Sequence, residues 1–360
     1  MKKTNAAILI LSNSWGGAEE SVYNIAKNIQ KKELELTLFL NDFLFKKFKS
    51  LRNINLINLG SYNSVKWYLK ILTIYKLHKV LLNELKKNNV EVLHAQLETS
   101  ILALGFILSK IQIPVIFTLR GDETRIFQNP VNLEHNIIHL ILKSMLRRKN
   151  IFITSISNWL IRDFNRKDKS KIEVIHNGVD CSLFKPLNIK MNNNTILYVG
   201  RFVTGKGIED LLEVARDLTD YQFLFAGKGP LEKLINLKNT KNLGFKTRDE
   251  LIKLYNSSAL CIFPSHYEAF GLVCLEAMSC GASVVATRVG FSEYVTNGKD
   301  GVIVTPGKVL ELKNSIVKLM DNPKLRSTLG KNARKKALKF NINKTAEKYH
   351  TLYKKIIVKR

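Results

Sequence analysis

The chain has 360 residues, of which 45% are hydrophobic and 24% are charged, so it is long enough to bury a sizeable core. Its 57 Lys and Arg residues outnumber 30 Asp and Glu residues, and the resulting net charge of +27 favours an anionic partner. No apolar run approaches the ~20 residues that cross a bilayer. The four cysteines have neither metal-ligand nor disulfide-framework spacing. Composition therefore excludes a bilayer-spanning helix, a zinc module and a disulfide scaffold.

The first half of the chain alternates apolar runs with loops and amphipathic segments. Residues 6–11 predict a strand that leads through a glycine-rich loop into a helix. The opening residues are superficially like a signal peptide, but their apolar run is short and lacks a small-residue cleavage site, so we expect the first strand of the fold. Further strands are predicted at residues 90–94, 115–119, 151–155 and 171–175.

Two stretches of this half, residues 43–49 and 65–87, interleave lysine with aromatic and aliphatic residues. The second predicts a helix whose apolar residues cover more than one face. Such a helix can lie in a membrane interface with its lysines reaching the head groups. It can equally pack in the core of the first sheet with its lysines solvated. Both interpretations stay open.

The second half repeats the alternation, with strands predicted at residues 196–199, 221–226 and 259–263. Strands that alternate with helices predict an α/β fold, here two Rossmann-like doubly wound domains with parallel sheets. We place the first domain at residues 1–185, a Pro- and Asn-rich linker at 186–194 and the second domain at 195–340. Residues 341–360 predict a basic helix that crosses back to the first domain. No strand-to-helix turn reads G-x-G-x-x-G, which disfavours a dinucleotide-dependent dehydrogenase.

A pair of glutamates in the second half, Glu268 and Glu276, brackets the run EAFGLVCLE. On a helix beginning near Phe270, the two acids would sit about two turns apart on roughly one face. The start of such a helix offers N–H groups and a positive dipole end to a diphosphate. A carboxylate further along the helix can accept hydrogen bonds from sugar hydroxyls.

Two cations, Arg201 and Lys206, lie in a glycine-containing loop between a predicted strand and the helix that follows it. Fixed positive charges beside a helix start suit a pyrophosphate leaving group, because negative charge builds on its oxygens as the bond breaks. The same pattern would also arise from ordinary solvated charges in a loop.

Seven motifs follow one another along the chain: GGAE (16–19), HNGVD with FKP (176–186), GRFVTGKG (200–207), FAGKGP (225–230), NLGF (242–245), EAFGLVCLEAMSCGASVVAT (268–287) and DGVIV (300–304). In their order and spacing they resemble the retaining GT-B glycosyltransferases of family 4, and the match spans most of the chain. The resemblance implies two Rossmann-like domains that face each other across a cleft.

The resemblance also implies a reaction and its residues. Arg201 and Lys206 would hold the pyrophosphate of the donor, and Glu268 would lie near the transferred sugar. The sugar would pass to an acceptor hydroxyl with retention at the anomeric carbon, without a metal and without a cofactor. The donor-binding residues would be Gly17, Phe245, Phe270, Gly271, Leu272 and Glu276, with Phe245 beside the nucleobase, Glu276 on the ribose, and residues 270–272 acting through main-chain amides.

One position departs from the family pattern, because many relatives carry a histidine where this chain has Arg120. Arg120 is either a variant of a subfamily with a different acceptor or donor sugar, or a cation that binds an acidic acceptor or the donor phosphate beside Asp122. His94, at another strand end, is either a packed residue or a cleft contact. Gly16 completes this set of candidate acceptor or phosphate contacts.

We expect a UDP-hexose or UDP-N-acetylhexosamine as donor and a glycan or lipid-linked acceptor, in the synthesis of a surface polysaccharide such as lipopolysaccharide or capsule. The expected location is the cytoplasm, with peripheral attachment to an anionic membrane face as a further option. An epimerase-like enzyme of the same fold is the first alternative. A nucleic-acid-binding protein is the second, but it rests on charge alone, because no recognition motif is present.

Overall fold

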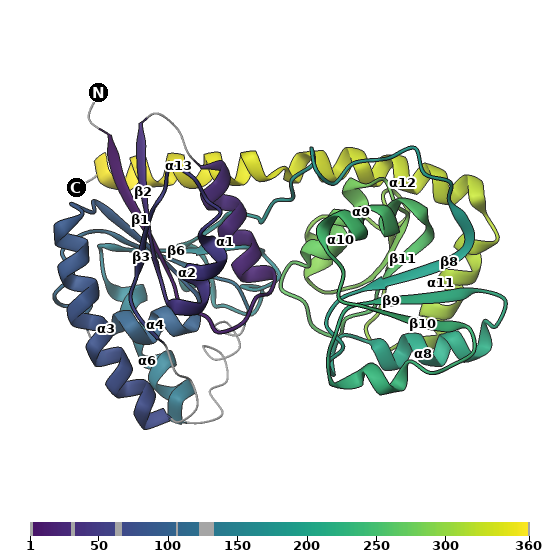
Figure 1. Cartoon of the computed structure of the whole chain (residues 1–360), viewed down its shortest axis with the longest axis horizontal. Helices are drawn as coiled ribbons and strands as arrows, with labels where there is room; N and C mark the ends of the chain where they lie inside the picture. Colours follow the sequence, from purple (N-terminus) through teal and green to yellow (C-terminus); the bar gives the residue numbers. More distant parts are fainter. Residues whose placement is uncertain (1–2, 30–32, 62–66, 106, 122–132, 359–360) are drawn as a thin grey trace. The chain divides into compact units, whose positions relative to one another are not determined.

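The computed structural model describes residues 3–29, 33–61, 67–105, 107–121 and 133–358, and for residues 67–76, 133 and 134 it describes the backbone alone. The chain divides into two compact units, each with its own sheet (Figure 1). Unit 1 contains Met1–His176 and Asn343–Arg360, and unit 2 contains Asn177–Ile342.

The boundary between the units lies after His176, nine residues before the predicted position. Residues that follow His176 are bonded within unit 2. The amide of Val179 donates to Phe340 O (2.9 Å), and the amide of Ile342 donates to Val179 O (2.9 Å). The guanidinium of Arg334 donates to Phe184 O (2.8 Å). Because these bonds join residues 177–185 to the last part of unit 2, the segment belongs to unit 2. Its position in the sequence, next to unit 1, does not reveal this.

Unit 1 is built on a seven-stranded parallel sheet in the order β3-β2-β1-β4-β5-β6-β7. Its strands are β1 (Thr4–Ile10), β2 (Leu34–Leu40), β3 (Asn55–Asn58), β4 (Val92–Gln96), β5 (Val115–Leu119), β6 (Ile151–Ser155) and β7 (Ile172–Val174). The strand order reverses at β1, which pairs with both β2 and β4. Ligands of doubly wound sheets bind beyond the carboxyl ends of the strands at such a reversal. β2 and β3 have no counterpart among the predicted strands.

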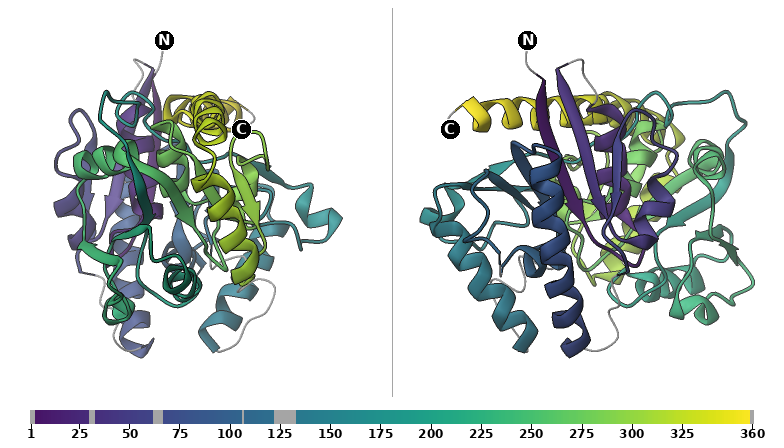
Figure 2. Two further views of the ribbon diagram at one scale, coloured as in Figure 1. Left: turned by 90° about the vertical axis from the view of Figure 1, so that its right-hand side faces the viewer. Right: turned by 60° about the vertical axis from the view of Figure 1, so that its left-hand side comes forward.

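Helices cover both faces of this sheet. They are α1 (Gly17–Asn28), α2 (Asp42–Phe48), α3 (Trp67–Lys87), α4 (Leu97–Gly105), α6 (Leu133–Arg147), the short α7 (Arg166–Lys169) and α13 (Ile342–Val358), which belongs to unit 1 from Asn343 onward. α3, α4 and α6 lie on one face of the sheet, and α1 and α2 lie on the other (Figure 1, Figure 2). Right-handed crossovers produce this division, because the strand order runs in opposite directions from β1.

The two lysine-rich stretches of unit 1 both form helices, α2 and α3. In α2, Leu44 and Phe48 are fully buried. In the part of α3 whose side chains are described, Leu77, Leu81 and Leu85 are buried in the core. These leucines pack inward, whereas Val80 of the same half is 41% exposed. The side chains of the aromatic first half of α3 are not among those that the structure describes. Within the described residues, no helix is long and apolar enough to cross a membrane.

Unit 2 contains a six-stranded parallel sheet in the order β10-β9-β8-β11-β12-β13. Its strands are β8 (Asn192–Val199), β9 (Gln222–Ala226), β10 (Thr240–Gly244), β11 (Ser258–Phe263), β12 (Val284–Thr287) and β13 (Val302–Val304). The reversal lies between β8 and β11, which pair with each other. The predicted α/β class with two Rossmann-like doubly wound domains is confirmed.

The helices of unit 2 are α8 (Ile208–Asp217), α9 (Arg248–Ser257), α10 (Leu272–Ser279), α11 (Val309–Met320) and α12 (Pro323–Ala337), with 3₁₀ turns η1 (Pro230–Leu234), η2 (Gly290–Glu293) and η3 (Leu338–Phe340). α8 packs against α11 on one face, and α10 packs against α9 and α12 on the other (Figure 1). The loops that follow β8 and β11 therefore emerge side by side at the carboxyl edge of the sheet.

Candidate functional site

Two neighbouring loops of unit 2, residues 200–207 after β8 and residues 264–271 after β11, form the centre of the candidate site. They touch at Gly207, whose φ is 70° and at which a Cβ atom would lie 2.1 Å from Pro264 O. Only glycine permits this left-handed conformation and this approach at low cost. The amide of His266 donates to Gly205 O (2.9 Å). The two loops are thus held together through their main chains.

The loop contact brings Lys206 and Glu268 together. Lys206 Nζ lies 2.8 Å from Glu268 Oε2 and 3.5 Å from Tyr267 O. Both charged side chains are about one-fifth exposed, at 19% and 21%. A second oxygen of the carboxylate, Oε1, accepts a hydrogen bond from the amide of Ala269 (3.2 Å). The predicted cation and the predicted sugar-side acid therefore form one partly buried ion pair.

A second side-chain contact joins the loop of Glu268 to helix α8. Nε2 of His266 lies 2.7 Å from Oδ2 of Asp210, a residue in the first turn of α8. A carboxylate only accepts, so Nε2 of His266 carries the hydrogen. The side chain of His266 is 46% exposed and that of Asp210 is 17% exposed. We call these two residues the loop clip, because together they connect the loop of Glu268 to the helix that follows Lys206.

The placement of Glu268 differs from the predicted one. Helix α10 begins at Leu272 with Gly271 as its N-cap, so Glu268 lies in the preceding loop and shares no helix face with Glu276. The reason is the backbone at Gly271, which has a φ of 81° and interrupts any helix that would start earlier. A Cβ atom there would lie 2.0 Å from Phe291 Cε1. The hydroxyl of Tyr294 fixes this turn by donating to Gly271 O (2.6 Å).

The residues before α10 present main chain rather than side chains. Phe270 is 1% exposed, and its ring packs 5.0 Å from that of Tyr294. Its side chain therefore belongs to the core, and a ligand could reach only its main chain. At Gly271, likewise, only the main chain is available to a ligand. The first amides of a helix such as α10 have no partner within the helix. Phe270, Gly271 and Leu272 thus suit the predicted main-chain role.

Glu276 lies on α10, and its Oε2 accepts a hydrogen bond from the hydroxyl of Tyr255 on α9 (3.1 Å). Tyr255 is 1% exposed. Burial, and then the charge of Glu276, raises the pKa of Tyr255 well above its usual range, so the phenol stays a donor. Tyr255 occupies one carboxylate oxygen of Glu276 and orients the side chain.

The remaining predicted residues of unit 2 are exposed. Arg201 extends into solvent, while its carbonyl accepts a hydrogen bond from the hydroxyl of Tyr198 (3.1 Å). Burial raises the pKa of Tyr198; the charge of Glu268 raises it further and that of Arg201 opposes it. Phe245 follows β10 and is 69% exposed, so its ring is accessible to a ligand.

In unit 1, Gly16 and Gly17 begin α1 at the carboxyl end of β1. The buried carboxylate of Glu19 accepts a hydrogen bond from the Gly16 amide (2.9 Å). A Cβ atom added at Gly17 would meet nothing within 4 Å, so the space above this glycine is open. His94 is completely buried, and both of its ring nitrogens have partners within unit 1. Asp122 lies outside the described residues.

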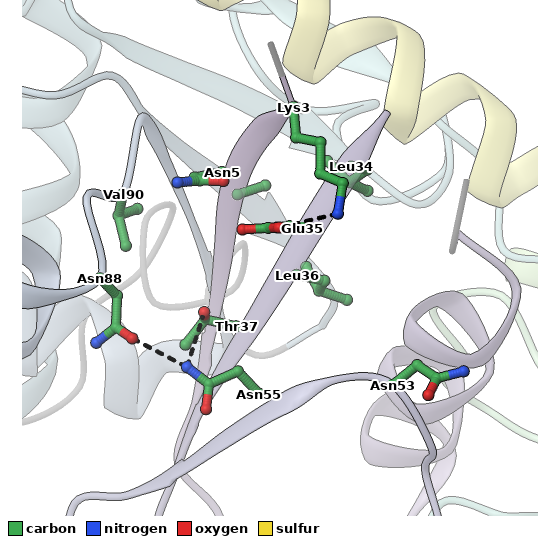
Figure 3. Close-up of a pocket in the computed structure, with 11 residues that line it drawn as sticks. Lys3, Asn5, Leu34, Glu35, Leu36, Thr37, Asn53, Asn55, Asn88 and Val90 are labelled. Carbon is green, nitrogen blue, oxygen red and sulfur yellow. Dashed lines mark hydrogen bonds and ion pairs between the residues drawn. The ribbon is translucent and has the colours of Figure 1, made fainter. Parts of the chain in front are cut away.

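A cavity of about 530 Å³ lies at the amino edge of the unit 1 sheet, opposite the edge at which its strands end (Figure 3). It is lined by residues at the amino ends of β1, β2 and β3 and at the end of α3, among them Asn5, Thr37, Asn55 and Asn88. Asn55 Nδ2 donates to Asn88 Oδ1 (2.9 Å) across it. None of the predicted site residues that the structure describes lines this cavity.

Several residues that complete the site were not predicted: Tyr198, Asp210, Tyr255, His266, Phe291 and Tyr294. Tyr198, Tyr255, Phe291 and Tyr294 each contact a predicted residue. Asp210 and His266 contact each other, although they are 56 positions apart. The periodicity of the sequence does not predict which residues of different elements will touch. The one usable clue is the position of His266 beside Glu268, in a loop already suspected of function.

Comparison with known proteins matches both halves of the chain to glycosyltransferase family models. The family model described as Glycosyltransferase Family 4 matches residues 15–183, and the one described as Glycosyl transferases group 1 matches residues 182–336. The chain is 27% identical over 350 residues to an uncharacterized glycosyltransferase of Methanocaldococcus jannaschii, which covers 95% of both chains.

Solved structures share the fold. The chain is similar to the sucrose-phosphate synthase of Thermosynechococcus elongatus, with a TM-score of 0.84, 20% identity and coverage of 99% and 100% of the two chains. It is also similar to the HepE protein of Anabaena in complex with UDP-glucose, with a TM-score of 0.78, 20% identity and coverage of 97% and 99%. With both halves matched by family models, the chain belongs to the GT-B glycosyltransferases of family 4.

Proposed function

We propose that this glycosyltransferase moves a sugar from a nucleotide diphosphate to a hydroxyl of a glycan or lipid-linked acceptor, with retention at the anomeric carbon. The observation that carries the proposal is the meeting of Lys206 and Glu268 at 2.8 Å, between the starts of α8 and α10. A cation, a carboxylate and two helix starts in one place supply what a sugar diphosphate needs: charge for the leaving group and an acceptor for sugar hydroxyls.

Arg201 and Lys206 are proposed to bind the diphosphate and to stabilise the charge that develops on it as the glycosidic bond breaks. Their two positive charges would fill the role that a divalent cation has in other glycosyltransferases, so the reaction is proposed to need neither metal nor cofactor. Glu268 would face the transferred sugar. The leaving phosphate can take the acceptor's proton, so no side chain is required as a strong base.

For the donor we propose a UDP-hexose or a UDP-N-acetylhexosamine. The similarity to HepE, whose structure contains UDP-glucose, supports UDP over other nucleotides. Glu276, oriented by Tyr255, would bind the ribose hydroxyls with its second carboxylate oxygen. The exposed ring of Phe245 would lie against the base. Main-chain amides at residues 270–272 would contact phosphate or sugar oxygens.

Unit 2 is thus proposed to hold the donor and unit 1 the acceptor. In unit 1, the open space above Gly17 leaves room for a close approach of donor phosphates, and Gly16 lies beside it. Arg120 is proposed to face an acidic acceptor or the donor phosphate. The charge surplus, with 16 basic and 3 acidic residues in positions 308–360, supports work at an anionic cytoplasmic membrane face on a lipid-linked acceptor, in surface polysaccharide synthesis.

Thermal stabilisation by UDP-, GDP- and ADP-sugars tests the donor assignment. A ligand at a hundred times its Kd adds about 2.7 kcal/mol of apparent stability. We expect a shift with UDP-sugars that disappears in Glu276→Gln. UDP release should follow when an acceptor is supplied. Conversion of the UDP-sugar without UDP release would instead point to an epimerase-like reaction, and no shift with any nucleotide sugar would refute the proposed site.

A further inference from the structure

A buried polar network in unit 1 joins the C-terminal helix α13 to the carboxyl ends of two central strands. It contains His94 and Gln96 from β4, Thr118 from β5, Arg120 just after β5, and Tyr353 from α13. Arg120 is 5% exposed and the other four are completely buried. Buried polar groups are costly unless they are hydrogen-bonded, so each hydrogen in such a network needs a defined place.

Arg120 determines the orientation of Gln96. Its Nε donates to Oε1 of Gln96 at 2.6 Å. A guanidinium has donors only, so the atom that faces it must be the amide oxygen. The amide nitrogen of Gln96 then points the other way and lies 2.6 Å from Nε2 of His94. An amide nitrogen only donates, and Nε2 of His94 must therefore be the acceptor.

The same logic fixes the hydrogen on His94. Because Nε2 accepts, the neutral ring carries its hydrogen on Nδ1, and Nδ1 lies 2.6 Å from the hydroxyl oxygen of Tyr353. The hydroxyl of Thr118, 2.6 Å from Nε2, can also donate to that nitrogen. Burial, and then the charge of Arg120, lowers the pKa of His94 well below its ordinary value, which agrees with a neutral ring.

We propose that Tyr353 is a positioning residue for Arg120 and acts through His94 and Gln96. The Tyr353 oxygen is the acceptor that the Nδ1 hydrogen requires. Without it, a buried donor has no partner, and moving the hydrogen to Nε2 would set it against the amide hydrogens of Gln96. The amide would then have to turn and present its nitrogen to the guanidinium. The C-terminal helix thereby controls a cation at the carboxyl edge of the unit 1 sheet.

The consequence for catalysis rests on the proposed function, in which Arg120 faces an acceptor or the donor phosphate. The hydrogen-bond chain itself does not depend on that role. Tyr349 supplies a matched control, because it is also a buried tyrosine of α13 and packs 4.9 Å from the His94 ring. Among the described residues, its hydroxyl has a single long contact, 3.4 Å to Thr118, so Tyr349→Phe removes the same group without breaking the chain.

Nitrogen-15 NMR of the full-length protein tests the network directly. The His94 ring signals are assigned from His94→Gln and the Arg120 Nε–H signal from Arg120→Lys. We expect neutral His94 with its hydrogen on Nδ1 in the wild type. In Tyr353→Phe, hydrogen exchange at Arg120 Nε should accelerate ~10-fold, whereas Tyr349→Phe should leave it unchanged. A wild-type hydrogen on Nε2, or equal effects in the two variants, would overturn the proposal.

Gln96→Glu gives a second variant that keeps the size of the side chain. A carboxylate still accepts from Arg120, but it cannot donate to His94, so the ring hydrogen should move to Nε2 or occupy both nitrogens. An unchanged His94 signal in this variant would show that Gln96 does not transmit the effect. This readout remains informative if Tyr353→Phe proves too unstable to study.

Donor turnover separates failure of the inference from failure of the proposed function. With the UDP-sugar that stabilises the protein most, UDP release to water should fall ~10-fold in Tyr353→Phe, while the Kd of UDP stays constant. Full activity in Arg120→Gln would refute the proposed role of Arg120, and the NMR signals would still decide the positioning. Reduced activity in Arg120→Gln but not in Tyr353→Phe would refute the positioning.

Discussion

The ammonium group of Lys206 lies 2.8 Å from Oε2 of Glu268, although the two residues are 62 positions apart. Each charge thus neutralises the other, and both side chains are about four-fifths buried. A diphosphate that binds Lys206 must compete with this carboxylate. Under the proposed function, donor binding would replace one ion pair by another and leave Glu268 available to sugar hydroxyls.

Lys206→Ala should remove about 2–4 kcal/mol of transition-state stabilisation, by analogy with the loss of an oxyanion-type donor. This corresponds to a fall of roughly 30-fold to 900-fold in kcat/KM for the nucleotide sugar. UDP release measures it. Lys313→Ala is the control, because Lys313 also forms an ion pair in unit 2, with Asp217 at 2.7 Å. Equal activity of both variants would contradict the role of Lys206.

Glu268→Gln should separate binding from turnover. It removes the charge that competes for Lys206 and repels phosphate, so UDP should bind more tightly than to the wild type. Turnover should nevertheless fall, because the sugar-side carboxylate is gone. Calorimetric titration with UDP and a turnover assay check the two effects. Weaker UDP binding would mean that Glu268 supports the diphosphate site rather than competing within it.

Glu276→Gln should weaken the binding of nucleotide sugars, because an amide presents only one acceptor oxygen to the ribose. Tyr255→Phe should produce a smaller loss, since the carboxylate remains but is no longer held by the 3.1 Å hydrogen bond. The donor KM measures both variants. A larger effect in Tyr255→Phe than in Glu276→Gln would show that the tyrosine supports the core of unit 2 instead of orienting Glu276.

The loop clip, His266 with Asp210, should hold Glu268 within reach of Lys206. Asp210→Asn and His266→Ala should each raise the donor KM several-fold, and the double variant should lose no more than the worse single variant, because both break one contact. Asp217→Asn, at the other end of α8 and in a similarly short pair with Lys313, is the control. Additive losses in the double variant would refute the clip.

His94 should make unit 1 less stable in acid. Its pKa in the folded chain is well below the ordinary 6.5, so between these values the unfolded chain binds a proton that the folded chain excludes. Stability is therefore complete above pH 6.5 and falls below it, by up to about 1.4 kcal/mol per pH unit. Burial also lowers the pKa of His78, which adds to the effect.

Urea unfolding at pH 7.5 and 5.5 measures this dependence. Fluorescence follows unit 1 selectively, because Trp15, Trp67 and Trp159 are the three tryptophans of the chain and all precede residue 177. His94→Gln should reduce the loss of stability between the two pH values, and His78→Gln gives the share of His78. A pH dependence unchanged by His94→Gln would contradict the neutral, buried ring.

The sequence by itself determined the fold class, because apolar strands and amphipathic helices alternate along the chain and parallel sheets follow from that alternation. It also determined the candidate donor residues, since Arg201, Lys206 and Glu276 lie in motifs of fixed order and spacing. β3 had no such signal, because it is short and has exposed asparagines at its ends. β2 reads LELTLFL, an apolar run that carries a strand signal although it was not among the predicted strands.

Only the tertiary structure decided which residues touch. Periodicity gives the face on which a side chain lies, but it does not pair Lys206 with Glu268 or His94 with Tyr353, which are 259 positions apart. The helix expected to begin near Phe270 begins at Leu272, because the left-handed turn at Gly271 and the ring of Phe291 leave no room for an earlier start. Such contacts arise when loops and helices distant in sequence are packed side by side, and packing depends on the whole fold.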